Sequence, residues 1–233
     1  MTKKKLRGWL ARAGLVVLGV VLLYQLWIFS QVLWWCWFDP SSSAFMQERL
    51  ELMQDKNPDA KLRHKWVPYS KISLNLKRAL VAAEDANFME HEGFEWEAIQ
   101  RAYEKNLKKG KIVAGGSTIS QQLAKNLFLS GRRSLWRKAE EAIITVMIEA
   151  VMSKQRIFEI YLNIIEWGNG VFGAEAAARH YYKKSAAGLD AWEAARLAAM
   201  VPKPRYYDRN RSTPWLDRKT NLILDRMPGA QVP

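Results

Sequence analysis

Two motifs within residues 84–128 carry side chains that could do chemistry. The first reads Glu84-Asp85-x-x-Phe88-x-x-His91-x-Gly93. The second begins 22 residues after Gly93 and reads Gly115-Gly116-Ser117-Thr118-x-x-Gln121-Gln122-x-x-Lys125-Asn126. Together they place acidic groups near a predicted helix start that offers hydrogen-bond donors and a lysine. Glycosyl transfer from a sugar pyrophosphate needs a carboxylate that takes a proton and a cationic site for the phosphate leaving group.

Glu84 is the candidate general base. The spacing of Leu76, Leu80 and Ala83 places it within the apolar stripe of a helix predicted over residues 74–89. A carboxylate there is partly desolvated, which raises its pKa and makes it a stronger base. The alternative is a buried glutamate paired with a cation for structural reasons, and placement alone favours that interpretation.

Asp85 and His91 are candidate supporting residues in the same motif. Asp85 follows Glu84 by about 100° around the predicted helix, where it can orient a neighbour or hold a divalent ion. His91 has two readings, a ligand-binding residue or a structural histidine. Because a single histidine is more often structural, we favour the second.

The second motif predicts a capped helix start. Thr118 and Gln121 have the spacing of a capping box, and two glycines allow the backbone to approach a ligand closely. Free N–H groups and the helix dipole make such a start a candidate anion site. Gln122 and Lys125 share one helix face with Thr118. The alternative is an ordinary helix cap followed by a lysine.

Two further motifs lie downstream. The third combines Arg133 with Arg137-Lys138-x-x-Glu141, where a carboxylate flanked by cations borders an apolar run. It can position a sugar hydroxyl or a pyrophosphate-bound metal, or it is a solvated, salt-bridged helix turn. The fourth reads Lys154-x-x-Ile157-x-Glu159-x-Tyr161-Leu162-Asn163 and is interpreted as mainly structural.

The N-terminal segment predicts a membrane anchor. No charged residue occurs between Arg12 and Asp39, a stretch that exceeds the hydrocarbon core of a bilayer. Tryptophans 34, 35 and 37 form an aromatic belt at one end, and basic residues precede the span. The positive-inside bias then places the N-terminus in the cytoplasm and the rest of the chain outside it. A cleaved signal peptide is the alternative, but the apolar run is long and no small-x-small cleavage site follows it.

The rest of the chain is predicted to be one mainly α-helical domain. The predicted boundaries are a basic tail over 1–12, a transmembrane anchor over 13–38, a stalk with an irregular lead-in over 39–70, and a globular domain over 71–233. No alternating strand of useful length and no internal repeat is found. The net charge of +13 suggests anionic partners, and the single cysteine excludes an internal disulfide.

The four motifs, in this order and spacing, resemble the peptidoglycan glycosyltransferase family. That family includes the monofunctional biosynthetic transglycosylases and the N-terminal halves of class A penicillin-binding proteins. The resemblance covers roughly residues 60–227, and a chain that ends soon after Met227 resembles the monofunctional type. It implies a lysozyme-like, mainly α-helical fold with a smaller membrane-facing lobe. It also implies lipid II, a lipid-linked disaccharide pentapeptide, and the lipid-linked growing glycan as substrates.

The resemblance also implies roles for individual residues. Glu84 matches the catalytic base and Glu141 a second functional glutamate. The implied substrate- and pyrophosphate-binding positions are Ser117, Thr118, Gln122, Lys125, Asn126, Arg133 and Arg137, and the supporting positions are Asp85, Phe88 and His91. Two departures from the family pattern are Ala86-Asn87 after the first motif and Glu140 before the second glutamate.

The expected cofactor is at most a divalent cation, Mg²⁺ or Mn²⁺, with Glu84 and Asp85 as candidate ligands and no organic cofactor. The expected location is the bacterial inner membrane, with a single span and an extracytoplasmic catalytic domain. Cell-wall synthesis or division proteins are candidate partners, and no nucleic acid is expected. Two rival functions stay open at this point: a glycan-cleaving, lysozyme-like enzyme and a non-enzymatic membrane scaffold.

Overall fold

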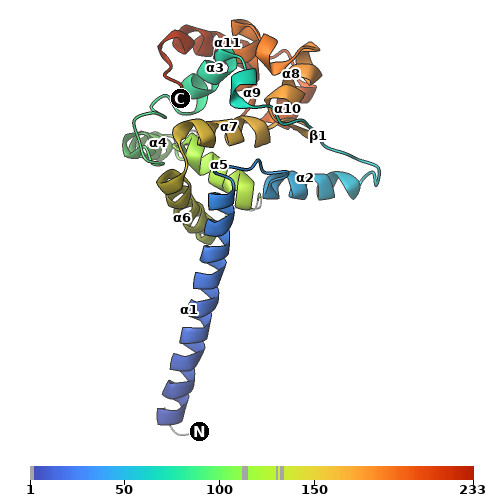
Figure 1. Ribbon diagram of the computed structural model, residues 1–233. Helices are drawn as coiled ribbons and strands as arrows, with labels where there is room; N and C mark the ends of the chain where they lie inside the picture. The colour runs from blue at the N-terminus through green and yellow to red at the C-terminus, as the bar shows by residue number, and fades with distance from the viewer. Residues whose placement is uncertain (1–2, 112–114, 130, 132–133) are drawn as a thin grey trace. The chain divides into compact units, whose positions relative to one another are not determined.

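The computed structural model describes residues 3–111, 115–129, 131 and 134–233, and the chain divides into two units, Met1–Asp39 and Pro40–Pro233. The first unit contains helix α1 (Lys3–Trp34) (Figure 1). Its segment Arg12–Trp34 has a mean hydropathy of 2.1 and is long and apolar enough to cross a membrane. Large apolar side chains along it, such as Leu15 and Leu23, are exposed. This helix is therefore a candidate membrane anchor.

The second unit is mainly helical, as predicted. Its α-helices are α2 (Ala44–Gln54), α3 (Leu74–Glu84), α4 (Trp96–Lys109), α5 (Ile119–Phe128), α6 (Leu135–Val151), α7 (Lys154–Ile164), α8 (Ala174–Tyr182), α9 (Ala191–Met200), α10 (Pro204–Arg209) and α11 (Pro214–Arg226). Short 3-10 turns cover η1 (Tyr69–Lys71), η2 (Ala186–Gly188) and η3 (Met227–Gly229). Three very short strands, β1 (Arg63–His64), β2 (Glu166–Gly168) and β3 (Val171–Phe172), form a small sheet in the order β1-β3-β2.

Most of the helices in this unit begin at a residue whose side chain caps the first turn. Hydroxyl or carboxylate oxygens accept a backbone N–H at the starts of α2, α3, α5, α6, α7, α9 and α11. The predicted capping box at Thr118 with Gln121 is present, and a second one joins Asp190 with Glu193. Because a cap is a local signal, these starts were readable from the sequence.

Two segments differ from the sequence-based expectation. Residues 39–70, predicted as a stalk and an irregular lead-in, contain α2 and β1, and 40–70 belong to the same compact unit as the rest of the domain. The helix predicted over 74–89 ends at Glu84. Asp85 then leaves the helical conformation, with φ −162° and ψ 78°, because its carboxylate is engaged by groups outside the helix.

Helix α7 lies in the core and links the elements that carry the site. It packs against α5 and α6 on one side and against α8 on another (Figure 1). Its residues Ile157, Phe158, Ile160 and Leu162 have no exposed surface. Helix α5 also packs against α2, while α3 packs against α9 and α11. These contacts fix the end of α3, the start of α5 and the first turns of α6, which is where the predicted site residues lie.

Candidate active site

A pocket of about 290 Å³ gathers most of the predicted binding residues. It is lined by Phe45, Ser117, Gln121, Gln122, Lys125, Gly131, Arg137, Lys138 and Glu141. These residues come from α2, α5 and α6 and from the segments that precede α5 and α6. Three cationic side chains and one carboxylate face the same space, so the pocket suits an anion such as a pyrophosphate.

Glu84 is joined to this pocket by a hydrogen bond from Gln122. The Gln122 amide nitrogen donates to Glu84 Oε2 at 2.9 Å, and the Tyr161 hydroxyl donates to Gln122 Oε1 at 3.0 Å. Tyr161 is fully buried, so its hydroxyl fixes which end of the Gln122 amide faces the carboxylate. The hydrogen bonds from Tyr161 to Gln122 and from Gln122 to Glu84 therefore orient the Glu84 carboxylate. Its second oxygen, Oε1, accepts no hydrogen bond from the described residues.

The environment of Glu84 suits a general base. Burial raises the pKa of its carboxyl, and the hydrogen bond from Gln122 opposes this shift. The positive charges of Lys219 and Lys125 lower the pKa further, whereas Asp85 raises it. The net result is a pKa above the ordinary value for a glutamate. The residue as a whole keeps some exposed surface, which leaves an approach for a substrate hydroxyl.

Lys125 is the cation on α5 that acts on both Glu84 and Glu141. Burial lowers the pKa of its ammonium, and the negative charge of Glu141 raises it. Arg137 and Lys138 lower the pKa again because like charges share the pocket. A bound dianion would relieve this repulsion, which is the electrostatic behaviour expected of a phosphate-binding pocket.

Glu141 is held between two cations on its own helix. Its side chain is 4% exposed, and its carboxylate pairs with Lys138 Nζ and, at 3.5 Å, with Arg137 Nη1. Lys138 Nζ also lies 3.5 Å from Ser117 Oγ. The predicted carboxylate flanked by cations is therefore present, and its geometry positions the two cations at the pocket wall.

Asp85 and His91 hold the first motif in place. Asp85 Oδ1 accepts from His91 Nε2 at 2.9 Å, and Oδ2 accepts from the backbone N–H of Ile119 at 2.8 Å. His91 Nδ1 in turn accepts from the N–H of Gly93 at 3.1 Å. Both ring nitrogens of His91 are thus engaged by protein groups, which favours its structural interpretation over ligand binding.

Protein groups already accept several of the backbone N–H groups at the start of α5, where the sequence predicts an anion site. Asp85 accepts the N–H of Ile119, and Thr118 Oγ1 accepts the N–H of Gln121. The Thr118 hydroxyl itself donates to Gly93 O at 2.7 Å and is 3% exposed as a residue. Thr118 therefore faces the protein and does not share the pocket with Gln122 and Lys125.

The second motif also packs in ways that the sequence did not indicate. A Cβ at Gly116 would lie 2.9 Å from Ile99 Cα, so this glycine admits the α4 backbone and not a ligand. Asn126 is 7% exposed and does not line the pocket. Phe88 is fully buried, with its ring 5.6 Å from that of Phe158. Arg133 lies outside the described residues.

Sequence reasoning missed three contributors to the site. Phe45 reaches the pocket from α2, in a segment whose prolines suggested irregular structure. Lys138 is a cation of the third motif that the sequence does not place among the binding positions, yet it lines the pocket. Lys219, on α11, acts on Glu84 from 135 residues away along the chain. No local sequence pattern predicts an interaction between residues so far apart in the chain.

The side chains present do not form a resident metal site at Glu84 and Asp85. Both Asp85 oxygens are occupied by protein donors, and one Glu84 oxygen accepts from Gln122. Among the described residues, no group of three or more histidine, cysteine, aspartate or glutamate side chains is placed to hold a metal ion. The divalent cation stays a prediction, and no chemical step is assigned to it.

Comparisons with known proteins identify the family of this chain. Residues 51–228 match the model of a protein family described as Transglycosylase. A biosynthetic peptidoglycan transglycosylase of Nitrosospira multiformis is 64% identical over 97% of this chain and 99% of its own length. Proteins of the same name from Methylobacillus flagellatus and Dechloromonas aromatica are 64% and 62% identical, over 95% and 99% of this chain and 97% and 100% of their own lengths. The chain belongs to the transglycosylase family.

Proposed function

We propose that this enzyme polymerises lipid II into linear glycan strands of peptidoglycan by inverting glycosyl transfer, with release of polyprenyl pyrophosphate. One observation carries the proposal: Glu84, a carboxylate of raised pKa, is joined through Gln122 to a pocket with three cationic side chains. The relatives' shared name, biosynthetic peptidoglycan transglycosylase, supports synthesis of glycan strands over cleavage.

In the proposed reaction, Glu84 removes the proton from the 4-hydroxyl of the acceptor lipid II. That oxygen attacks C1 of the terminal muramoyl sugar of the donor, which is the growing, lipid-linked glycan. The C1–O bond to the pyrophosphate breaks with its electron pair, and the α-linked leaving group departs from the opposite face. The new bond is therefore β, and the proton resides on Glu84 until solvent removes it.

The three cations of the pocket stabilise the charge that develops on the leaving pyrophosphate. Lys125, Arg137 and Lys138 line one space, where the Glu141 carboxylate keeps two of them in position. The predicted contribution of Arg133 stays a prediction. A neutral sugar leaving group, as in hydrolysis of a glycan, would not use these charges, which favours the pyrophosphate donor over the glycan-cleaving alternative.

The membrane fixes where the substrate is found. Helix α1 supplies a candidate anchor. Its basic start supports a cytoplasmic N-terminus, with the domain on the other side of the bacterial inner membrane. None of the residues described in α4 is buried, and Trp96, Leu135 and Trp136 are 73%, 93% and 78% exposed. These side chains suit contact with lipid, which would confine the search for a polyprenyl-linked substrate to two dimensions.

The basic test uses purified full-length protein in detergent with labelled lipid II, analysed by gel electrophoresis. We expect polymeric glycan to appear with time. Parallel reactions with a chelator or with Mg²⁺ or Mn²⁺ test the predicted divalent cation. Fragmentation of preformed glycan without polymer formation would instead identify a lytic enzyme, and no reaction with either substrate would favour the scaffold.

Replacing Lys125 should weaken use of the donor. We expect Lys125→Ala to lower kcat/KM by about 10- to 100-fold, the usual value of one charge-assisted hydrogen bond. Initial polymerisation rates over a range of lipid II concentrations measure it. Lys71→Ala, at an exposed lysine outside the pocket, is the matched control. A wild-type rate in Lys125→Ala would remove this residue from the site.

The pH profile of kcat/KM should be bell-shaped and narrow. Glu84 acts only when deprotonated, and its raised pKa moves the acid limb to higher pH than for an ordinary glutamate. Lys125 acts only when protonated, and its lowered pKa moves the alkaline limb to lower pH. In Lys125→Ala the alkaline limb should move to higher pH or disappear, because the group that causes it is gone, and the acid limb should stay where it is. An acid limb at the ordinary glutamate pKa would contradict the burial of Glu84.

A further inference from the structure

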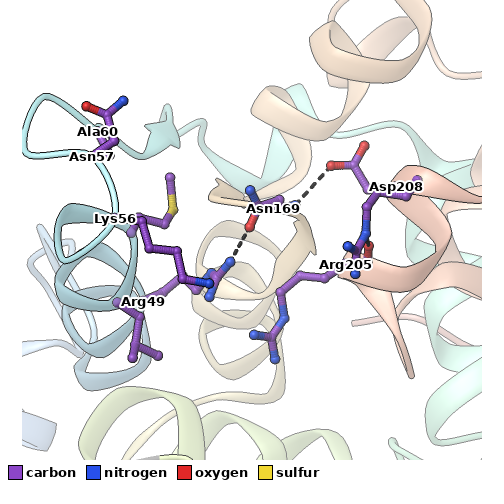
Figure 2. A pocket seen from close by; sticks show the side chains of 10 residues that line it. Arg49, Lys56, Asn57, Ala60, Asn169, Arg205 and Asp208 are labelled. Atoms are coloured by element: carbon purple, nitrogen blue, oxygen red, sulfur yellow. Dashed lines mark hydrogen bonds between the residues drawn. The ribbon is translucent and has the colours of Figure 1, made fainter.

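A second and larger pocket, of about 690 Å³, lies between α2, the turn that joins β2 to β3, and α10 (Figure 2). Its lining includes four cationic side chains and one carboxylate: Arg49, Lys56, Arg205, Arg209 and Asp208. None of these was singled out by the sequence motifs, and the proposed reaction uses none of them. The pocket therefore has an unassigned excess of positive charge.

The charge is only partly neutralised by the surrounding protein. Glu166, with a side chain 3% exposed, lies 3.4 Å from Arg49 Nε and 3.4 Å from Arg205 Nε. Both distances are longer than a good charge-assisted hydrogen bond. Figure 2 shows Arg49 and Arg205 on opposite sides of the pocket, each extending toward its middle. Within the described chain, neither the Nη groups of Arg205 nor Lys56 Nζ form a hydrogen bond or ion pair with another side chain.

The one carboxylate of the lining is already committed to the protein. Asp208 accepts from His180 Nε2 at 2.8 Å, from the N–H of Asn169 at 3.0 Å and from Arg211 Nη2 at 3.2 Å. These bonds hold Asn169 at the pocket wall, where its amide oxygen accepts from Arg49. Asp208 thus fixes the geometry of the pocket and is not available to neutralise Lys56 or Arg205.

Helix α2 connects this pocket to the active site. Phe45 lines the first pocket, and Arg49 and Met53 line the second. These three residues recur every four positions, so they lie on one face of α2. Eight residues of helix span about 12 Å, whereas an extended pentapeptide spans about 17 Å. A substrate held at the first pocket can therefore reach the second with its peptide.

We propose that this second pocket binds the terminal carboxylate of the peptide carried by the lipid-linked substrate. The inference rests on the proposed function and adds a specificity-determining subsite to it. The planar forks of Arg49 and Arg205 match a carboxylate in shape. Among the described residues, Glu166 is the one carboxylate that they share, so with Lys56 and Arg209 in the same lining the positive charge exceeds what Glu166 neutralises. In the proposed reaction the pyrophosphate of the same substrate occupies the other pocket, and a pocket within the reach of an extended pentapeptide suits the carboxylate at the end of that peptide.

The test compares two substrates, lipid II with its free C-terminal carboxylate and lipid II with a C-terminal carboxamide. With wild-type enzyme we expect the carboxamide to raise KM about tenfold at similar kcat. Lys56→Gln and Arg205→Gln should each raise KM for the carboxylate substrate and leave KM for the carboxamide unchanged. Lys71→Gln, which removes the same charge outside the pocket, should change neither.

The outcomes separate the two proposals. If wild-type enzyme polymerises both substrates with equal KM, the carboxylate subsite is refuted while the polymerase function stands. If the two variants raise KM equally for both substrates, the pocket acts through general attraction to anions or anionic lipid, and the subsite is again refuted. If wild-type enzyme polymerises neither substrate, the proposed function itself fails. Thermal unfolding of Arg205→Gln, which loses its contact with Glu166, checks that the variant is folded.

Discussion

Glu84→Gln should give a folded protein that does not polymerise lipid II. The amide has the size of the carboxyl and keeps a hydrogen bond to Gln122, but it cannot take the proton from the acceptor hydroxyl. Removal of a general base usually lowers the rate by about 100- to 10,000-fold. Initial rates of polymerisation with labelled lipid II measure the effect on kcat, and KM should change little because the pyrophosphate pocket is intact.

The same substitution should not destabilise the protein at neutral pH. A carboxyl whose folded pKa is raised favours the folded state below its unfolded pKa, and this contribution is lost as the pH rises through the folded pKa. A buried Glu84 is therefore costly to ionise, and the neutral amide avoids this cost. We expect the Tm of Glu84→Gln to equal or exceed that of wild type at pH 7.

Glu90→Gln is the matched control for this experiment. It makes the same chemical change at an exposed glutamate only six residues away. We expect wild-type rates and Tm for this variant. Retention of most activity in Glu84→Gln would refute the assignment of the base, whereas a large loss of Tm would show that the carboxylate is structural, the alternative that its sequence position favoured.

The helical architecture and much of the site could be predicted because their signals are local. Hydroxyl and carboxylate caps marked the starts of α5 and α9, and the mainly α, lysozyme-like fold class is confirmed by the family match. The pocket contains Gln122 and Lys125, which share a helix face, and Arg137 and Glu141, which are one turn apart. For residues on the same helix, spacing alone determines that they meet.

What could not be predicted depends on contacts between distant segments. The sequence shows that Thr118 caps a helix, but not that Asp85 fills the same helix start or that Gly93 takes the Thr118 hydroxyl. The second pocket joins α2 to α10, with Arg49 and Arg205 on either side of Glu166. No motif links these residues. Packing brings them together, so only the three-dimensional structure reveals the pocket.

Asp85→Ala should be the most destabilising single change at the site. The Asp85 side chain has no exposed surface, and its carboxylate is the acceptor for both His91 Nε2 and the N–H of Ile119. Removing it leaves two donors without their partner, at a cost of about 3 kcal/mol. For a domain of this size, that corresponds to a decrease in Tm of about 6–12 °C. Asp59→Ala, at an exposed aspartate, is the control.

Asp85→Asn should recover only part of this loss. Its amide oxygen can accept from one donor, the N–H of Ile119, but its amide nitrogen then faces His91 Nε2. The neutral imidazole has one acceptor nitrogen, and in this structure Nδ1 serves that role for the N–H of Gly93. Asparagine therefore satisfies the N–H of Ile119 but sets its own N–H against the N–H of His91 Nε2, with no acceptor between them. We expect a Tm between those of wild type and Asp85→Ala.

Both Asp85 variants should also lose polymerase activity, because Asp85 ties the end of α3, which carries Glu84, to the start of α5, which carries Gln122 and Lys125. Measuring Tm with and without a divalent cation distinguishes this positioning role of Asp85 from a role as a metal ligand. If Asp85 only positions these helices, Mg²⁺ or Mn²⁺ leaves the Tm difference between wild type and variant unchanged. If it were a metal ligand, the cation would raise the Tm of wild type alone, and the difference would grow with its concentration.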